Sequence, residues 1–240
     1  MPYKMLKGFS PWEIIIKNLE TDHEISLSNK YRSLCPFCYY PIRKDSIKQC
    51  HIGIEHHTSK VSFITGHFYE TDYKGTPLNW YSKLIKDISN FPFRFSHELL
   101  SLVLVEKILN SNWILDEIAF STMVPTTNQQ MESLFSKISE KLKLFWIPSD
   151  QFFIRKELTR SYKDRKSYVY NKYFLEENKI SNYKNLDKNR PILIFDDIFH
   201  QGYTFGRIVE LLNNLSFKKF NLVTIARTVP KSFLKTFSFP

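Results

Sequence analysis

Cysteine is scarce in this chain of 240 residues: there are three, and all lie between positions 35 and 50. So few clustered cysteines argue against a fold held together by disulfide bonds. Long apolar runs are missing too, because the segment 99–105 is short and charged residues follow it directly; no membrane span is expected. Residues 1–10 lack a long apolar core, so we expect no signal peptide and a soluble cytoplasmic protein.

The composition is that of a folded protein. Hydrophobic residues make up 42% of the chain and aromatic residues 16%, which allows a sizeable core. The formal net charge is +10, and residues 151–190 alone hold eleven Lys or Arg against five Asp or Glu. Such a segment suits a phosphate-bearing ligand or nucleic acid, although a solvated lysine-rich face has the same composition.

The stretch 190–212 predicts a strand, a loop and a helix in succession. Residues 192–195 form a short apolar run typical of a buried strand, and Asp196 and Asp197 follow at its carboxyl end. The loop 200–204 comes next. Apolar residues then recur at helical spacing, which predicts a helix that begins near Thr204.

A loop that leads into a helix N-terminus is suited to an anion, because the first amides of the helix are free to donate. Two carboxylates beside a bare phosphate would repel it. They are favourable if the ligand also carries hydroxyl groups, or a bound Mg²⁺. A phosphorylated sugar satisfies both demands. The alternative is an ordinary strand-loop-helix unit with an acid pair at the surface.

This segment resembles the signature of the type I phosphoribosyltransferases. The resemblance implies that Asp196 and Asp197 hold the ribose hydroxyls of phosphoribosyl pyrophosphate (PRPP). It also implies that the following loop wraps the 5′-phosphate, through His200, Gln201, Gly202, Tyr203 and Thr204. Gly202 and Thr204 match the family pattern, whereas bulkier residues replace the small ones at the other three positions.

A second strand-loop-helix unit is predicted upstream, with a strand at 117–124 and a helix at 130–144. By resemblance, the loop between them would hold the pyrophosphate through Pro125, Thr126 and Thr127. The segment 152–174 would be a mobile loop that supplies Arg155, Arg160 and Arg165 to the leaving pyrophosphate, with Mg²⁺ bound to it. Further elements are expected as strands at 61–69 and 220–226 and helices at 78–88 and 95–110.

The three cysteines stand in a spacing typical of a zinc site. Cys35 and Cys38 form a CxxC pair, and Cys50 follows twelve residues later without a CxxC partner of its own. We expect His56 or His57 as the fourth ligand of a structural Zn²⁺, with His51 less favoured. The alternatives are a degenerate ribbon that no longer binds metal, and thiols packed in a small core.

Taken in order, these motifs resemble the ComF/ComFC competence family, in which a zinc module precedes a phosphoribosyltransferase domain. The expected fold class is therefore α/β: a parallel-sheet type I phosphoribosyltransferase fold at 76–240 and a zinc-ribbon-like module at 1–75. The family's link to DNA uptake implies single-stranded DNA and a helicase as partners. Two hypotheses follow: a PRPP-binding transferase with an unknown acceptor, and a non-catalytic single-stranded DNA-binding adaptor that retains the fold.

Overall fold

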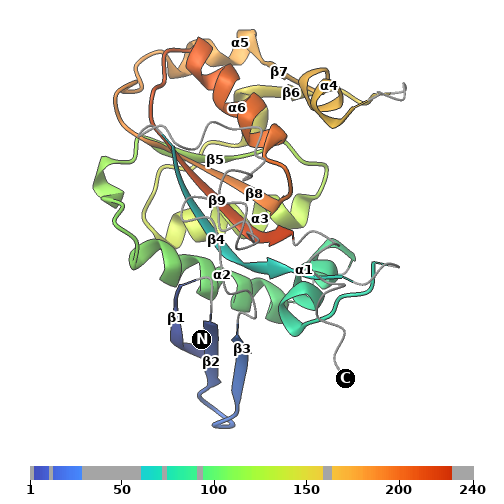
Figure 1. Cartoon of the computed structure of the whole chain (residues 1–240). Coiled ribbons are helices and arrows are strands. Elements are labelled where there is room, and N and C mark those ends of the chain that lie inside the picture. The colour runs from blue at the N-terminus through green and yellow to red at the C-terminus, as the bar shows by residue number, and fades with distance from the viewer. Residues whose placement is uncertain are drawn as a thin grey trace, which may run out of the picture.

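The computed structural model describes residues 3–10, 13–28, 61–71, 75–90, 94–158 and 164–228 (Figure 1). These residues form a four-stranded parallel sheet, a three-stranded antiparallel sheet and a two-stranded antiparallel ribbon. Helices cover the parallel sheet on both faces, so the α/β class predicted from the sequence is confirmed.

The parallel sheet has the strand order β4-β9-β8-β5. Its strands are β4 (Val61–Tyr69), β5 (Phe120–Met123), β8 (Ile192–Phe199) and β9 (Phe220–Thr228). The last of these in chain order, β9, lies between β4 and β8 and pairs with both. Its first eight residues are all buried, as expected for a parallel strand that is covered on both faces.

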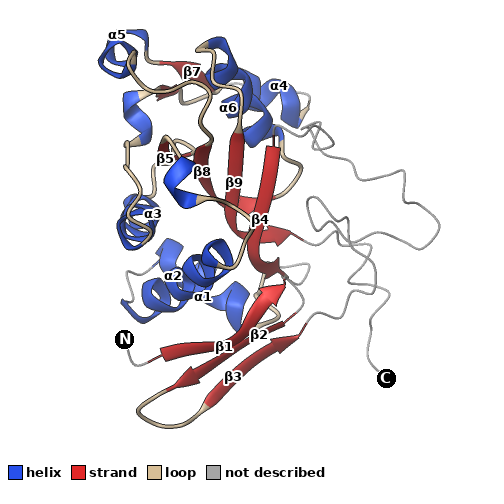
Figure 2. Cartoon of the chain, turned by 90° about the vertical axis from the view of Figure 1, so that its left-hand side faces the viewer, coloured by secondary structure: helices blue, strands red, loops and turns tan. Residues whose placement is uncertain are grey.

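Three helices pack on one face of this sheet: α1 (Trp80–Asn90), α2 (Arg94–Leu109) and α3 (Gln129–Lys141). Their apolar stripes share one core with alternate residues of the strands, such as Leu193 and Phe195. The remaining strand residues, such as Ile192 and Ile194, face a second core with α6 (Tyr203–Asn214). Figure 2 shows the first three helices on one side of the sheet and α6 above them.

The N-terminal strands form the antiparallel sheet in the order β1-β2-β3, with bounds Tyr3–Ser10, Glu13–Asn18 and Glu24–Ser28. Ile14 and Ile16 are fully buried in the same core as α1 and α2. The indole nitrogen of Trp80 donates to the carbonyl of Ser26 at 3.1 Å. The helical layer therefore lies between the two sheets, as Figures 1 and 2 both show.

Glycine is required at one position of β4. A Cβ at Gly66 would lie 2.0 Å from the hydroxyl of Tyr81 and 2.3 Å from the carbonyl oxygen of Ile225. The absence of a side chain lets the Tyr81 hydroxyl donate to that carbonyl at 2.9 Å. This bond joins α1 to β9 across β4. Gly66 thus allows a buried contact between a helix and a strand that lie 144 residues apart.

A small antiparallel ribbon stands beside α6. It consists of β6 (Phe153–Arg155) and β7 (Tyr173–Leu175), with the short helix α4 (Arg165–Tyr170) between them. We call residues 153–158 and 164–175 the basic ribbon. It is attached to α6 by Arg207, whose Nε donates to the carbonyl of Tyr173 at 3.2 Å. The remaining short helices are η1 (Leu115–Glu117), η2 (Ser149–Gln151), α5 (Glu177–Ile180) and η3 (Ser181–Tyr183).

Most predicted elements are present, and two differ in length. The strand expected at 117–124 is shortened to β5, because the Arg190 guanidinium donates to the carbonyls of Asp116, Glu117 and Ile118 and holds η1 there. The strand expected at 192–195 continues to Phe199, since β9 keeps pairing with it. The acid pair is therefore inside β8 rather than after it.

The boundary predicted at 75/76 places β4 in the N-terminal module, yet β4 pairs along its length with β9 in the parallel sheet. The expected zinc ligands, Cys35, Cys38, Cys50 and His56, lie outside the described residues, and so does Arg160. Among the described residues, none of the helices has the length and apolar character that a membrane span requires.

Candidate functional site

The carboxyl ends of β5 and β8 open into a cavity of about 210 Å³. β5 ends at Met123, opposite Phe195, so β8 continues past it and its next residues are uncovered on that side. The basic ribbon closes the cavity from above. The cavity is lined by Met123, Val124, Pro125, Thr126, Met131, Arg155, Arg165, Tyr168, Val169, Lys172, Tyr173, Asp196, Asp197, Ile198 and Thr204.

Asp196 and Asp197 lie in this cavity, as the sequence analysis expects. The backbone amide of Asp197 donates to Oδ1 of Asp196 at 3.0 Å, and the amide of Ile198 donates to Oδ1 of Asp197 at 2.6 Å. Burial and the adjacent Asp197 carboxylate raise the pKa of Asp196 well above its ordinary value, while the Lys172 ammonium acts in the opposite direction.

The loop 200–204 forms a second, smaller cavity of about 30 Å³ that adjoins the first. Arg165, Asp196, Ile198 and Thr204 line both cavities. Gly202 has a φ of 77°, which is the left-handed region, and it precedes α6 without any side-chain cap. The N-cap residue of α6 therefore makes no side-chain hydrogen bond to the first amides of the helix, which leaves them free to donate to an anion.

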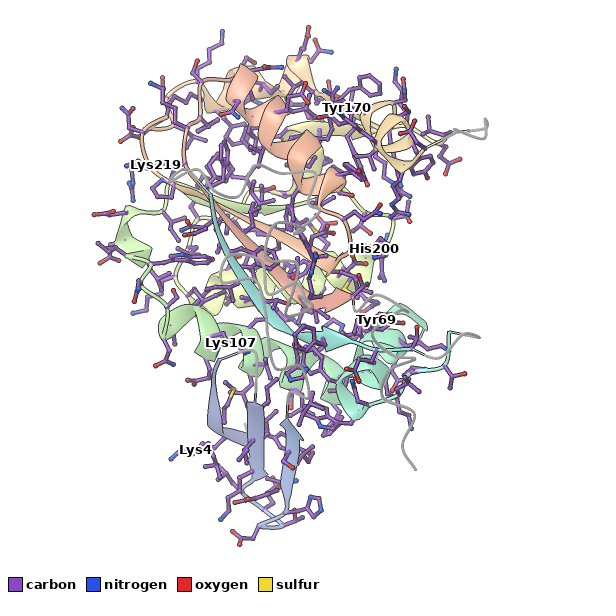
Figure 3. All side chains as sticks on the ribbon, in the orientation of Figure 1. Lys4, Tyr69, Lys107, Tyr170, His200 and Lys219 are labelled. Atoms are coloured by element: carbon purple, nitrogen blue, oxygen red, sulfur yellow. The ribbon has the colours of Figure 1, made fainter. Side chains whose placement is uncertain are left out.

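His200 is fixed at the base of this loop. Its Nδ1 lies 2.6 Å from Oγ1 of Thr228, and its carbonyl accepts a hydrogen bond from Nη1 of Arg227 at 2.8 Å. Arg227 is fully buried and its guanidinium lies over the ring of Phe199, 4.3 Å from the centroid. Burial and the positive charges of Arg165 and Arg227 lower the pKa of His200. Figure 3 labels His200 beside the carboxyl end of the sheet.

Three cations from the basic ribbon line the larger cavity: Arg155, Arg165 and Lys172. None of them takes part in the ion pairs formed between described residues. The positive charge of Lys172 acts to lower the pKa of Asp196, that of Arg165 lowers the pKa of His200, and that of Arg155 acts to lower the pKa of Tyr173. The cavity thus holds positive charge that the described part of the protein does not neutralise by direct pairing.

The loop after β5 differs from the loop after β8. Pro125 and Thr126 line the cavity, whereas Thr127 is exposed and does not. Asn128 caps α3, because its side-chain oxygen accepts from the amide of Gln130 at 3.0 Å. The Thr126 hydroxyl in turn accepts from the amide of Asn128 at 3.1 Å.

Part of the cavity wall was not expected from the sequence. Lys172, Tyr168 and Tyr173 all face the cavity, although only the arginines of this segment were singled out. Their signal is present in the sequence as aromatic residues interleaved with cations in 152–174. What the sequence could not supply is the folding back of β7 on β6, which brings Tyr173 opposite Arg155.

The acid pair contributes two carboxylates, and the described residues contain no group of three or more His, Cys, Asp or Glu suited to a metal. Two carboxylates are nevertheless a donor set that fits Mg²⁺. This ion commonly takes one or two protein carboxylates and completes its shell with water and substrate phosphates.

No protein family model and no curated protein matches the chain. A search of solved structures found similarity to the Helicobacter pylori xanthine-guanine-hypoxanthine phosphoribosyltransferase. The TM-score is 0.36 and the sequence identity 16%, with 60% of this chain and 96% of that chain covered.

Proposed function

We propose that the cavity binds a phosphorylated sugar of the PRPP type, and that the protein is a phosphoribosyltransferase-like protein of the ComF type. The observation that carries this proposal is the meeting of two carboxylates and three cations in one cavity. Carboxylates accept hydrogen bonds from hydroxyl groups, and cations bind phosphate oxygens. A ligand that bears both groups accounts for a cavity that bears both kinds of side chain.

The arrangement suits one orientation of the ligand. The ribose hydroxyls would bind Asp196 and Asp197, and the 5′-phosphate would bind at the amides of the loop 200–204. The pyrophosphate would then lie between Thr126 and the cations of the basic ribbon, Arg155 and Arg165. Both cavities share Asp196 and Thr204, so a single ligand can extend from one into the other.

In the transfer reaction, the bond between C1 of the ribose and the pyrophosphate oxygen breaks, and its electron pair leaves with the pyrophosphate. A lone pair on the acceptor, which we take to be nucleobase-like, forms the new bond to C1, and the acceptor loses a proton to solvent. Arg155 and Arg165 would stabilise the negative charge that develops on the leaving pyrophosphate. Mg²⁺ bound with the ligand would neutralise further phosphate charge.

The experiment is calorimetric titration of the protein with PRPP and Mg²⁺. We expect micromolar binding that Asp196→Asn and Asp197→Asn each weaken about 30-fold or more, because charge-assisted hydrogen bonds are lost. The matched control is Asp150→Asn, an exposed acid in η2 that pairs with Lys179 outside the cavity. A folded protein that does not bind PRPP would overturn the proposal, and so would equal weakening by all three variants.

A second candidate function is binding of single-stranded nucleic acid by the basic ribbon. Nζ of Lys156 lies 4.3 Å from the ring centroid of Phe174, Nζ of Lys166 lies 5.7 Å from that of Tyr170, and the Arg207 guanidinium in α6 lies 5.1 Å from that of Tyr170. Rings that alternate with cations suit stacked bases and their phosphates. The resemblance of the sequence to the ComF/ComFC family makes a helicase the expected protein partner in DNA uptake.

Fluorescence anisotropy with a labelled deoxythymidine oligonucleotide separates this candidate from the first. Phe174→Ala should weaken binding about fivefold or more, and affinity should fall steeply with added salt. Asp197→Asn should leave it unchanged. Oligonucleotide binding that is absent at low salt would exclude the candidate.

From the sequence alone we also propose that Cys35, Cys38, Cys50 and His56 bind a structural Zn²⁺. Metal analysis of the purified protein should find one zinc per chain, and Cys38→Ser should remove it. A chain that is folded and free of zinc would exclude this site.

A further inference from the structure

The position of Lys172 distinguishes it from the other two cavity cations. It precedes β7 and is held from both sides, because its amide donates to the carbonyl of Val169 at 3.1 Å and its carbonyl accepts from the amide of Lys156 at 2.8 Å. The backbone of the basic ribbon thus fixes the point from which the side chain enters the cavity.

Aromatic rings hold the ammonium group. Nζ of Lys172 lies 5.2 Å from the ring centroid of Tyr168 and 5.4 Å from that of Tyr173, and both rings line the cavity. Ring faces attract a cation without neutralising it. The ammonium therefore keeps its full charge while it stands in the same cavity as Asp196 and Asp197, and none of the ion pairs between described residues includes it.

Two adjacent carboxylates in one cavity repel each other, and the raised pKa of Asp196 reflects burial and that repulsion. Positive charge close to the pair relieves the repulsion without a proton. A divalent cation from solvent is one solution, and a fixed side-chain cation is another. Arg165 also lines the smaller cavity at the loop 200–204, where its charge lowers the pKa of His200, and the charge of Arg155 acts to lower the pKa of Tyr173. Lys172 lines the larger cavity together with the acid pair, and its charge acts to lower the pKa of Asp196.

We propose that Lys172 is the built-in counter-ion of the acid pair: it excludes a free divalent cation from the empty cavity and turns to the ligand's phosphates when a sugar phosphate enters. Its four-carbon stem and unpaired ammonium allow this exchange, whereas an ion-paired arginine would resist it. The ligand's hydroxyls then replace the ammonium at the carboxylates. The cation that accompanies the ligand enters with the phosphates rather than ahead of them.

This inference rests on the proposed function for its ligand, but its first test needs no ligand. Binding of Mn²⁺ alone can be followed by the loss of the free-ion electron paramagnetic resonance signal. Lys172→Met should bind Mn²⁺ on the order of tenfold more tightly than the unmodified protein, because a repelling charge has been removed from the acid pair. The double variant Lys172→Met with Asp197→Asn should lose that gain.

The second measurement is the affinity for PRPP with Mg²⁺, which Lys172→Met should weaken on the order of tenfold. Opposite changes in the two affinities are the signature of a counter-ion, since a merely structural defect would weaken both. Lys172→Arg retains the charge and should restore the Mn²⁺ value, whereas the PRPP affinity should recover only in part, because a guanidinium exchanges partners less readily than an ammonium. The control is Lys188→Met, a lysine whose Nζ lies 3.8 Å from the ring centroid of Phe217 and which does not line the cavity.

Three outcomes are decisive. Tighter Mn²⁺ binding together with weaker PRPP binding supports the proposal. Unchanged or weaker Mn²⁺ binding by a folded Lys172→Met protein overturns it, whatever PRPP does. If Mn²⁺ binding tightens but the unmodified protein does not bind PRPP, the counter-ion role stands and the proposed function fails.

Discussion

The two strand-loop-helix units that meet at the cavity have the same order of elements but differ in how the helix N-terminus is capped. In the β5–α3 unit, Asn128 caps the helix and the Thr126 hydroxyl accepts from the amide of Asn128. In the β8–α6 unit, Gly202 precedes the helix in a left-handed conformation and no side chain caps it. The first loop therefore satisfies its own helix, whereas the second leaves its amides for a ligand.

The difference teaches how a ligand loop can be recognised in an α/β protein. Both loops lie at the carboxyl edge of the sheet, which is where ligands bind in such folds. Their positions alone do not separate them. The capping residue does, because a capped helix N-terminus has already used an amide that an anion would need.

The largest effect we predict is on the stability of the parallel sheet to which both units belong. Gly66→Ala forces a methyl group against the Tyr81 hydroxyl and the Ile225 carbonyl, so it should lower the free energy of unfolding by about 3 kcal/mol. Denaturant unfolding followed by circular dichroism measures this. Gly75→Ala is the control, because a Cβ there meets nothing within 4 Å; its φ of 81° limits the cost to about 1–2 kcal/mol. Equal effects would contradict the close approach at Gly66.

The next prediction concerns the β8–α6 unit alone. Gly202→Ala should cost about 1–2 kcal/mol of stability, because a residue with a Cβ is strained at a φ of 77°. It should also weaken PRPP binding about tenfold, since the loop amides would be displaced from the phosphate. Thermal unfolding and calorimetry on the same samples measure both. If affinity were unchanged at reduced stability, the loop would have no part in ligand binding.

The matching change in the β5–α3 unit should affect stability and spare the ligand. Asn128→Ala removes the cap of α3 and should lower the free energy of unfolding by about 1 kcal/mol. The affinity for PRPP should stay within a factor of two of the unmodified protein, which is about 0.4 kcal/mol. Asn128→Ser, which retains a capping oxygen, should recover most of the stability. A large loss of affinity would mean that the two loops share the ligand's phosphates.

The smallest predicted effect is a pH dependence of stability to which the loop of the β8–α6 unit contributes and the loop of the β5–α3 unit does not. His200 has a lowered pKa because of burial and the charges of Arg165 and Arg227, whereas residues 125–128 contain no titratable side chain. A histidine whose folded pKa is depressed contributes stability above its unfolded pKa of about 6.5, and that contribution is lost as the pH falls through the folded value. Because His200 is partly exposed, its contribution to the slope of the free energy of unfolding against pH should be only about a few tenths of a kcal/mol per pH unit.

Denaturant unfolding between pH 7.5 and 5 tests this by comparing variants. His67 is buried with a pKa lowered to about 3 by burial and by Lys107, so it contributes a slope of the same sign to every variant. The slope should therefore persist in His200→Gln but become shallower than in the unmodified protein, whereas Asn128→Ala should leave it unchanged. Parallel slopes in all three proteins would show that His200 is not perturbed.

Local patterns in the sequence predicted most elements, because periodicity and turn residues act over short distances. The strand at 61–69 and the start of the helix near 204 were placed to within one residue of β4 and α6. The errors arose where a contact with a residue far away in the sequence determines the local structure. Arg190 lies 73 residues beyond Glu117, whose carbonyl it binds, and this contact replaced the expected start of a strand.

Separation along the sequence also decides which parts of the site could be foreseen. Asp196, Asp197 and Thr204 lie close in sequence, and a single strand-loop-helix pattern brings them together. Lys172 was not foreseen, because it enters the cavity only after β6 and β7 pair. Thr127 was expected to line the site but is turned outward, since Asn128 and Thr126 fix the loop beside it.

The place of β9 at the centre of the parallel sheet has a consequence for the growing chain. β4 finds its partner 159 positions later, where Val61 stands opposite Phe220. Until β9 leaves the ribosome, β4 has no partner in the parallel sheet and β8 can pair only with β5. Assembly of the four-stranded sheet must then wait until residues 220–228 have been made, and pairings between such distant segments form slowly. A chain interrupted before residue 220 should expose these strands to aggregation and to chaperones.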